Sequence, residues 1–554
     1  MGAEAPKRAS WRMTKGRLNE LGLGKGWNKG IGYGTVTALL AVFLAGCSND
    51  PGTEGEGNPS SGKDGSGSTK PVELTLMAFE SAEVAKSDDD PIYKALQEKL
   101  NIRLKVVSSP FNNYNDKLNV MIASGELADL FYGDGIGNLE QFHTWIEEEI
   151  VLPMSDRSAG YPNLDKALKR FDMYKAATGG KHYGLPITSY SDIDKPVYND
   201  HTMWIRKDWL DKLHLQVPTT IDEFYQVAKA FAEQDPDGNN KADTYGYGSS
   251  DGSWWFYPIL NAFGTSQDRY KKVDGKWVPE VIQPETKEAL AFLKKLYDEK
   301  IMDPEFMINN GEQLIEKFVA GKVGIIFKNG SMFYNTFYDK FEKAYPGRDP
   351  KSMFVAGGVM KGKSGAKRLD GFGNFWMTTL INNQIGEEKK KKALELLDYL
   401  ASDEGMRLMR WGVEGRHYRK EGDKFVSLVE KDENGVQKTL AKVAPTARLK
   451  TLITWDNGFV PENTRNREEV IKAGREGIEN ANVDPLFGMV IDPKALPPEL
   501  TKTLGDYVEE TFVQTIARSK QFDADWEKFV KTWLSKGGQK AWDETNKKAL
   551  EEGR

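Results

Sequence analysis

The hydrophobic pattern at the start of the folded region alternates between strand-like and helix-like segments. Apolar residues are nearly continuous in VELTLMAF (72–79) and IRLKVVS (102–108), which predicts buried strands, whereas PIYKALQEKL (91–100) repeats them at helical spacing. A helix ended by Gly125 and a strand within ADLFYGDG (128–135) complete a β-α-β-α-β order. Because parallel strands are joined by helical crossovers, this order predicts a parallel sheet flanked by helices.

The alternation continues and predicts a second α/β region. A strand in KHYGLPIT (181–188) precedes a long helix at 221–234, for which Thr219 or Thr220 is a plausible N-cap ahead of Glu223. We therefore expect an α/β protein of two lobes, with the chain crossing between them near 190–205 and 323–330. The expected division is lobe 1 at 72–195 and 328–400, and lobe 2 at 196–327 and 401–554.

The first 46 residues are expected to be a signal peptide rather than part of the fold. Basic residues dominate 1–30, and an apolar run follows from Ile31 to Cys47 that is too short to span a bilayer comfortably. Its end, Leu44-Ala45-Gly46-Cys47, resembles a bacterial lipobox, in which the cysteine is acylated and becomes the first mature residue. The alternative is a short N-terminal membrane anchor that is never cleaved.

Composition supports an exported protein and removes several function classes. Residues 47–71 are rich in Gly, Ser, Pro and charge, which predicts a flexible tether. The 554 residues carry a net charge of -6, and without residues 1–46 the charge becomes -11, with 69 basic and 80 acidic residues. This balance argues against nucleic acid as a partner. One cysteine and five scattered histidines exclude a disulfide framework and a cysteine-based zinc site.

A loop after the predicted helix at 221–234 has the spacing of a cation site. Its oxygen-bearing residues alternate along the chain, as in the first nine positions of an EF-hand loop, and Lys241 would contribute its backbone carbonyl. Asn240 and Gly246 stand where an EF-hand has Gly and a bidentate Glu, so a true EF-hand is not expected. A compact structural calcium loop is the hypothesis, and an ion-free Asx turn is the alternative. The candidate ligands are Asp235, Asp237, Asn239, Lys241 and Asp243.

Fourteen tryptophans suggest a carbohydrate site, because the apolar face of a sugar ring stacks on an aromatic plane while its hydroxyls bind polar neighbours. Trp204 and Trp209 lie in apolar segments and are assigned to the core. Several others adjoin Gly or polar residues, although core packing is the alternative for each. Charged residues at expected strand ends or in loops are further candidates, with solvated loop charges as the alternative. The candidate ligand-binding residues are Glu80, Asp134, Trp254, Trp255, Trp376, Trp411, Arg416 and Trp455.

The chain resembles the substrate-binding lipoproteins of ABC importers, in particular the large oligosaccharide-binding group. Four stretches in order carry the resemblance: TMWIRKDWLDKLHLQVPTTIDEF, DPDGNNKADTYGY, GFGNFWMTTLI and GMRLMRWGVEGRHY. The resemblance implies a periplasmic-binding-protein-like fold of type II, with two α/β lobes that close over a solute by a hinge. It further implies an oligosaccharide ligand, a permease partner, a lipid anchor on the extracellular face of the cell membrane, a structural calcium ion and a monomer without catalytic residues.

Three other interpretations carry less weight. Residues 357–364 match the phosphate-loop pattern GxxxxGK[ST], but the glycine-rich continuation lacks the helix that such a loop requires. A secreted polysaccharide-degrading enzyme, either a glycoside hydrolase or a lyase, is the main alternative, since a pair of catalytic carboxylates leaves no signature in so acidic a chain. A surface adhesin would show repeated strands in place of the α/β pattern.

Overall fold

A computed structural model gives the fold of residues 70–551. Internal contacts divide the chain into Met1–Gly67 and Ser68–Arg554, and only the second unit is described below. The residues inside 70–551 that fall outside the description are 87–88, 111–112, 134–138, 172–177, 179, 189–200, 251–255, 364, 366, 370–374, 432–436, 457–465, 476–481 and 484–497. The expected signal peptide, Cys47 and almost all of the tether at 47–71 therefore lie outside the described residues.

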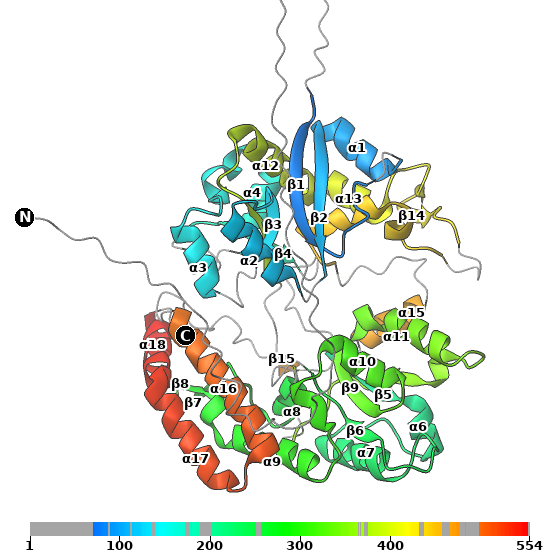
Figure 1. Cartoon of the computed structure of the whole chain (residues 1–554), viewed down its shortest axis with the longest axis vertical. Coiled ribbons are helices and arrows are strands. Elements are labelled where there is room, and N and C mark those ends of the chain that lie inside the picture. Colours follow the sequence, from blue (N-terminus) through cyan, green and yellow to red (C-terminus); the bar gives the residue numbers. More distant parts are fainter. Residues whose placement is uncertain are drawn as a thin grey trace, which may run out of the picture. The chain divides into compact units, whose positions relative to one another are not determined.

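The first sheet has the strand order β2-β1-β3-β12-β4. β1 (Val72–Phe79) pairs in parallel with β2 (Ile102–Ser109) along its whole length and with β3 (Leu130–Gly133) on its other side. β12 (Phe375–Ile381) runs antiparallel to both β3 and β4 (Gly184–Thr188). The parallel β-α-β-α-β unit predicted from the hydrophobic pattern is confirmed, and Figure 1 shows β1 and β2 side by side.

Helices cover this sheet and share one core with it, which is why β1 is apolar at consecutive positions. The buried carboxylate of Asp90 connects α1 to the segment around Thr446 by hydrogen bonds. It accepts hydrogen bonds from the first turn of α1, at Ile92 N (2.9 Å) and Tyr93 N (3.2 Å), and from Thr446 N (2.8 Å). The helical elements of this core are α1 (Pro91–Leu100), α2 (Tyr114–Ser124), α3 (Leu139–Glu147), α4 (Pro162–Lys169), α12 (Glu387–Ala401), α13 (Asp403–Trp411), α14 (Leu440–Val443) and the 3-10 segment η8 (Pro445–Leu452).

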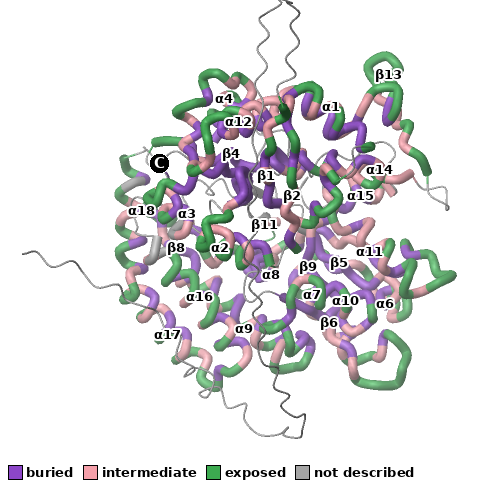
Figure 2. The backbone as a smooth tube through the Cα atoms, turned by 45° about the horizontal axis from the view of Figure 1, so that its top comes forward, coloured by how far each residue is buried: buried purple, intermediate pink, exposed green. Residues whose placement is uncertain are grey.

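The second sheet has the strand order β10-β5-β9-β6. β5 (His201–Arg206) lies antiparallel between β10 (Phe354–Ala356) and β9 (Val323–Asn329), and β6 (Tyr245–Tyr247) runs parallel to β9. Six consecutive residues of β9 are buried, as expected for a strand with neighbours on both sides, and β5 and β9 belong to the buried parts of the tube in Figure 2.

The helices around the second sheet bury their apolar sides in two adjoining clusters. The start of α7 is a capping box, in which Thr220 Oγ1 accepts from Glu223 N (3.2 Å) and the Glu223 carboxylate accepts from Thr220 N (3.2 Å), so one of the two predicted caps is confirmed. These helices are α6 (Lys207–Lys212), α7 (Ile221–Glu233), α8 (Tyr257–Ala262), α9 (Pro284–Asp298), α10 (Gly311–Val319), α11 (Gly330–Ala344), α15 (Arg467–Arg475), α16 (Pro498–Arg518), α17 (Phe522–Trp533) and α18 (Gln539–Glu551).

Three small two-stranded sheets complete the described strands. β13 (Tyr418–Glu421) and β14 (Lys424–Ser427) form a hairpin after α13, and β7 (Tyr270–Val273) and β8 (Lys276–Pro279) form another. β11 (Arg368–Leu369) pairs in parallel with β15 (Asn482–Val483). The described residues 357–363 of the phosphate-loop match contain no helix.

The sheets and cores divide the chain at other positions than the expected lobe boundaries. Residues 330–356, expected in lobe 1, form α11 and β10 and pack with the second sheet. Residues 403–453, expected in lobe 2, include α13 and η8, whose buried residues belong to the core of the first sheet. The division at 328 and 400 is therefore corrected, because the buried face of an amphipathic helix does not reveal which sheet will cover it.

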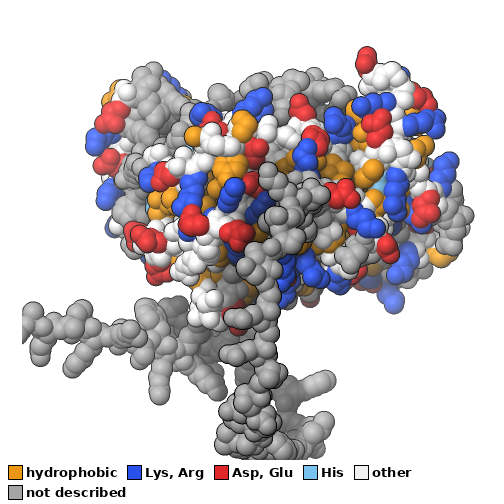
Figure 3. Space-filling model, turned by 90° about the horizontal axis from the view of Figure 1, so that it is seen from above, with side chains coloured by type: hydrophobic (Ala, Val, Ile, Leu, Met, Phe, Trp, Pro, Cys, Tyr) orange, Lys and Arg blue, Asp and Glu red, His pale blue; other side chains and the backbone are white. Residues whose placement is uncertain are grey.

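The surface of the described part carries both signs of charge. Basic and acidic side chains are interspersed over the face drawn in Figure 3, and many of them form exposed ion pairs such as Lys502–Asp506 (2.5 Å) and Lys207–Asp211 (2.5 Å). Among the described helices, none combines the length and the apolar character needed to cross a membrane.

Candidate functional site

The carboxyl ends of β1, β3 and β4 meet at one edge of the first sheet, because these strands share one direction. The segment 445–456, which we call the edge segment, runs across this edge. Arg448 Nη1 donates to the carbonyl of Glu80, directly after β1 (2.8 Å), and Trp455 N donates to the carbonyl of Thr188 at the end of β4 (2.7 Å). In α/β proteins this edge is where ligands commonly bind.

Four aromatic rings gather where β1, β3 and the edge segment meet. The Phe79 ring stacks on Tyr132 with centroids 5.0 Å apart and lies 4.3 Å from Tyr114. The half-buried Trp455 ring lies 6.3 Å from Phe79 and 6.5 Å from Tyr132. Burial raises the pKa of Tyr132, whose hydroxyl forms a 2.8 Å hydrogen bond with the Thr451 hydroxyl, so this phenol stays protonated. Tyr114 and Tyr132 are fully buried, so the rings of this group that keep exposed surface are Phe79 and Trp455.

An ion cluster adjoins this aromatic group at Asp456, the residue after Trp455. Arg410, from α13, holds the Asp456 carboxylate with two hydrogen bonds, from Nε (2.7 Å) and Nη2 (2.5 Å). Lys450 Nζ lies 3.8 Å from the same carboxylate. The Asp456 side chain is fully buried, whereas Arg410 and Lys450 are 21% and 29% exposed. Burial lowers the pKa of Lys450; the Asp456 charge opposes this shift and the Arg410 charge adds to it.

The structure places four of the predicted ligand-binding residues and brings two of them to one place. Glu80 and Trp455 lie at the edge described above, and the exposed Glu80 has a left-handed backbone (φ 41°). Trp411 ends α13 and its ring lies 5.2 Å from Phe425 on the hairpin β13–β14, while Arg416 is exposed in the turn before β13. Trp411 also lies 6.3 Å from Tyr418 of the same hairpin.

The other predicted residues cannot be placed against this edge. Asp134, Trp254 and Trp255 lie outside the described residues. Trp376 lies on β12, and its side chain is also outside the description.

Trp204 and Trp209, assigned to the core from the sequence, are fully buried, which confirms that assignment.

Sequence reasoning missed Phe79, Tyr132, Arg410, Lys450 and Asp456. Asp456 stands beside Trp455 in the stretch TWDNG, so a signal for this residue was present in the sequence. Arg410 and Lys450 had no such signal, because Lys and Arg are common throughout this chain and only the packing of α13 against η8 brings them to one carboxylate.

The candidate calcium loop follows α7, and three of its carboxylates accept hydrogen bonds from Asn239. The Asn239 side-chain amide donates to Asp237 (2.7 Å) and Asp243 (3.0 Å), and Asn239 N donates to Asp235 (3.1 Å). Burial, together with the nearby charges of Asp235 and Asp243, raises the pKa of Asp237. Hydrogen bonds from Lys322 (2.6 Å) and Asn239 lower the pKa of Asp243. The loop thus concentrates negative charge around one amide.

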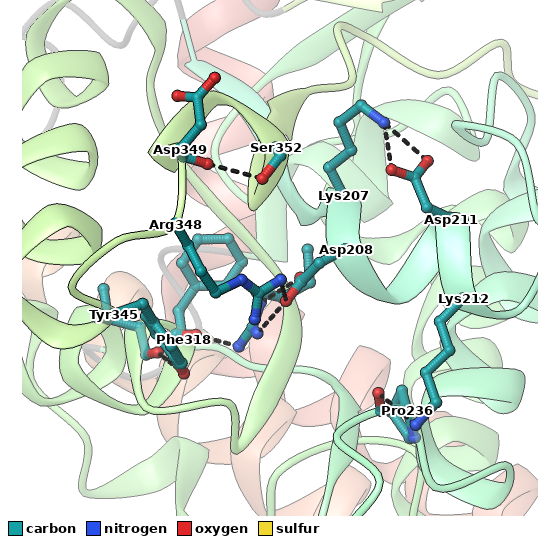
Figure 4. Close-up of polar contacts among 12 residues, drawn as sticks. Lys207, Asp208, Asp211, Lys212, Pro236, Phe318, Tyr345, Arg348, Asp349 and Ser352 are labelled. Carbon is teal, nitrogen blue, oxygen red and sulfur yellow. Dashed lines mark hydrogen bonds and ion pairs between the residues drawn. The ribbon is translucent and has the colours of Figure 1, made fainter.

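The side chains of Asp235, Asp237 and Asp243 offer carboxylate oxygen atoms, which are the ligands that a hard cation such as calcium prefers. Lys212 of α6 anchors the loop from outside by donating to the carbonyls of Asp235 (2.9 Å) and Pro236 (3.1 Å), as Figure 4 shows for Pro236. Lys241 N donates to Asn239 Oδ1 (2.8 Å). In the present arrangement, no three His, Cys, Asp or Glu side chains of the described residues are grouped so that they could hold a metal ion.

The amino-acid sequence is similar to those of known solute-binding proteins. The family described as bacterial extracellular solute-binding protein matches residues 80–407. Lipoprotein LipO of Bacillus subtilis is 31% identical over 405 residues, covering 72% of this chain and 75% of the relative. The polygalacturonan/rhamnogalacturonan-binding protein YtcQ of the same organism is 27% identical over 511 residues, covering 91% and 95%.

A solved structure has a similar fold. The substrate-binding protein FusA of the Streptococcus pneumoniae ABC transporter, in complex with kestose, superposes with a TM-score of 0.62 at 20% identity, covering 87% of this chain and 99% of that one. This likeness bears on the fold, which is of the type II periplasmic-binding kind, as the resemblance implied. The family match and the LipO relationship together show that this chain belongs to the family of bacterial extracellular solute-binding proteins.

Proposed function

We propose that this protein captures an oligosaccharide and passes it to the membrane permease of an ABC importer. The observation that carries the proposal is the pair of partly exposed aromatic rings, Phe79 and Trp455, at the carboxyl edge of the first sheet. The partly exposed Arg410 binds Asp456, the residue after Trp455. Sugars need such a combination, because their C–H faces stack on aromatic rings while their hydroxyls require polar partners.

The relatives support the same ligand class. YtcQ is named for binding polygalacturonan and rhamnogalacturonan, and the FusA structure holds kestose. The two ligands named for YtcQ are acidic polysaccharides and kestose is neutral, so the relatives leave the charge of the sugar open.

The replacement Trp455→Ala is expected to weaken sugar binding by about tenfold or more, corresponding to about 1.4 kcal/mol of lost binding energy. Titration calorimetry against a panel of acidic and neutral oligosaccharides would first identify a binding sugar and then compare the variants. Trp542→Ala in α18 is the matched control, since Trp542 donates to the Trp277 carbonyl (2.5 Å) on the other hairpin, β7–β8. Unchanged affinity in a folded Trp455→Ala protein would refute this placement of the site.

The mixtures of protein and sugar from the calorimetry also distinguish a binding protein from a polysaccharide-degrading enzyme. We propose that the protein has no catalytic activity, so chromatography after prolonged incubation should recover the sugar intact. Release of shorter sugars would favour the glycoside hydrolase or lyase interpretation.

Three further predictions from the sequence are part of this proposal. They are a lipid anchor at Cys47 that holds the protein on the outer face of the cell membrane, a monomeric state, and no interaction with nucleic acid. We also retain the remaining candidate ligand contacts as part of the proposal: Glu80, Asp134, Trp254, Trp255, Trp376, Trp411 and Arg416.

We further propose that a structural calcium ion binds the loop at 235–243, where it would relieve the repulsion among Asp235, Asp237 and Asp243. Saturating calcium should raise the melting temperature relative to excess chelator, because a ligand at a hundredfold its dissociation constant stabilises the folded state by about 2.7 kcal/mol. Asp235→Asn with Asp237→Asn should abolish the difference, whereas Asp506→Asn on the exposed face of α16 should preserve it. Equal melting temperatures in calcium and chelator would disprove the calcium proposal.

A further inference from the structure

The backbone at Glu80 is strained and is held by hydrogen bonds on both sides. Glu80 follows β1 with a φ of 41°, in the left-handed region that residues other than Gly, Asn and Asp seldom adopt. Its N–H donates to the carbonyl of Ser109 (2.9 Å), and the next N–H, that of Ser81, donates to Ser108 Oγ (2.9 Å). The carbonyl of Glu80 accepts from Arg448 Nη1 (2.8 Å). These contacts keep the strained turn in one conformation.

Arg448 binds the backbone of Glu80 and not its side chain. An arginine beside a carboxylate commonly forms a bidentate ion pair with it. Here the guanidinium donates to the carbonyl, and the Glu80 carboxylate forms no hydrogen bond or ion pair with any of the described residues. Both residues are exposed. The contact therefore fixes the turn and leaves the carboxylate available to a ligand.

The free carboxylate belongs to the edge of the first sheet that carries the exposed aromatic rings. Phe79, the residue before Glu80, has a partly exposed ring 6.3 Å from that of Trp455. Arg448 and Trp455 both lie on the edge segment, so this segment presents an aromatic ring and also holds the turn at Glu80.

A role in ligand binding would account for the strain. Glycine or asparagine would adopt the same backbone at a lower energy, and strained residues of other types cluster at ligand sites, where the surrounding structure holds them in place. An ionised carboxylate only accepts hydrogen bonds, and the hydroxyl groups of a sugar can donate them.

We propose that the Glu80 carboxylate accepts hydrogen bonds from hydroxyl groups of the bound sugar, and that Arg448 is a positioning residue that holds Glu80 through its carbonyl. This inference rests on the oligosaccharide-binding function proposed above and assigns a separate role to each residue. Arg448 acts through Glu80, so its removal lowers the affinity only while the carboxylate is present.

The first test is Glu80→Asn, measured by titration calorimetry with kestose, galactotriose and trigalacturonate as probes. The affinity for the sugar that the wild-type protein binds should fall about tenfold or more, because hydrogen bonds to a charged group are lost. The melting temperature should equal or exceed that of the wild type, because asparagine tolerates the left-handed backbone better than glutamate does. Glu80→Gln, which keeps the length of the side chain, should also lower the affinity but should leave the melting temperature unchanged.

The second test is a double-mutant cycle between Arg448 and Glu80. Arg448→Met should lower the affinity about threefold or more in the wild-type background and should have no further effect in Glu80→Asn. Arg448→Lys should keep most of the affinity, since a lysine can donate to the same carbonyl. Lys442→Met, which also removes one exposed positive charge, from the neighbouring α14, is the matched control and should bind as the wild type does.

Four results would overturn the inference. Unchanged affinity in a folded Glu80→Asn protein would refute the role of the carboxylate, and Trp455→Ala would still test the oligosaccharide function. A lower melting temperature together with the lower affinity would assign Glu80 to the fold. An equal loss from Arg448→Met in both backgrounds would show that Arg448 supports the edge segment and not Glu80. Absence of binding by the wild-type protein to the three probes and to every other sugar of the panel would remove the proposed function together with this inference.

Discussion

The replacement Asp456→Asn should destabilise the protein by about 3 kcal/mol, because it removes a buried carboxylate that faces both Arg410 and Lys450. Removing a single partner from a buried ion pair leaves the remaining charge desolvated and uncompensated, which typically costs about 3–5 kcal/mol. We expect the lower end of this range, since both cations retain some contact with solvent. Asparagine keeps the size of the side chain and tolerates the left-handed backbone of Asp456 (φ 58°), so the substitution removes the charge and one of the two oxygens that accept from Arg410 without a change in volume.

Urea denaturation followed by tryptophan fluorescence would measure this loss. Asp506→Asn is the control, because Asp506 forms an exposed pair with Lys502 whose side chains are 65% and 58% exposed, and such pairs contribute at most about 1 kcal/mol. The double variant with Lys450→Met should recover part of the stability by removing one of the two uncompensated charges. A midpoint for Asp456→Asn equal to that of the wild type would show that the cations do not depend on this carboxylate.

The replacement Trp204→Ala should cost about 3–5 kcal/mol, the usual loss for a large aromatic side chain deleted from a core. The Trp204 side chain on β5 is fully buried, and its ring lies 4.9 Å from Phe337 and 5.8 Å from Phe354. Its Nε1 donates to the carbonyl of Asn329 (3.3 Å), so the deletion also leaves that acceptor without this partner. The three rings come from β5, α11 and β10, and their packing holds the edge strand of the second sheet.

Thermal and urea unfolding of Trp204→Ala would check this expectation. Met332→Ala is the matched control on α11, since Met332 is 52% exposed and its truncation should change stability by no more than about 0.5 kcal/mol. Trp204→Phe should lie between the wild type and Trp204→Ala, because it keeps part of the ring contacts and loses the hydrogen bond. A loss below about 1 kcal/mol for Trp204→Ala would contradict the role of this cluster.

The hydrophobic pattern predicted the β-α-β-α-β unit of the first sheet because the information for such a unit is local. Near-continuous apolar runs at 72–79 and 102–108, separated by a helix with apolar residues at helical spacing, define a β-α-β unit with few alternatives. The cap at Thr220 was equally local, since Thr220 and Glu223 are three residues apart. The division into lobes was a different problem. The pairing of β10 with β5 joins Phe354 to Arg206, and no short-range pattern encodes that contact.

The candidate site shows the same distinction. Trp455 and Glu80 were identifiable from an aromatic residue among polar neighbours and from a charge at the end of a strand. Arg410 and Lys450 were not, because their role depends on how α13 and η8 pack and on the burial of Asp456. The charge state of this cluster therefore follows from tertiary contacts.

The sequence by itself determined the α/β class, the β-α-β-α-β unit of the first sheet, the family resemblance and the residue types suited to a sugar. It could do so because periodicity, capping and short motifs act over a few residues. Only the tertiary structure decided which helices cover which sheet, which aromatic rings meet at the carboxyl edge of the first sheet, and which cations share Asp456. These contacts join residues from β1 to the edge segment, and burial, which fixes the energy of each charge, is a property of the packed molecule alone.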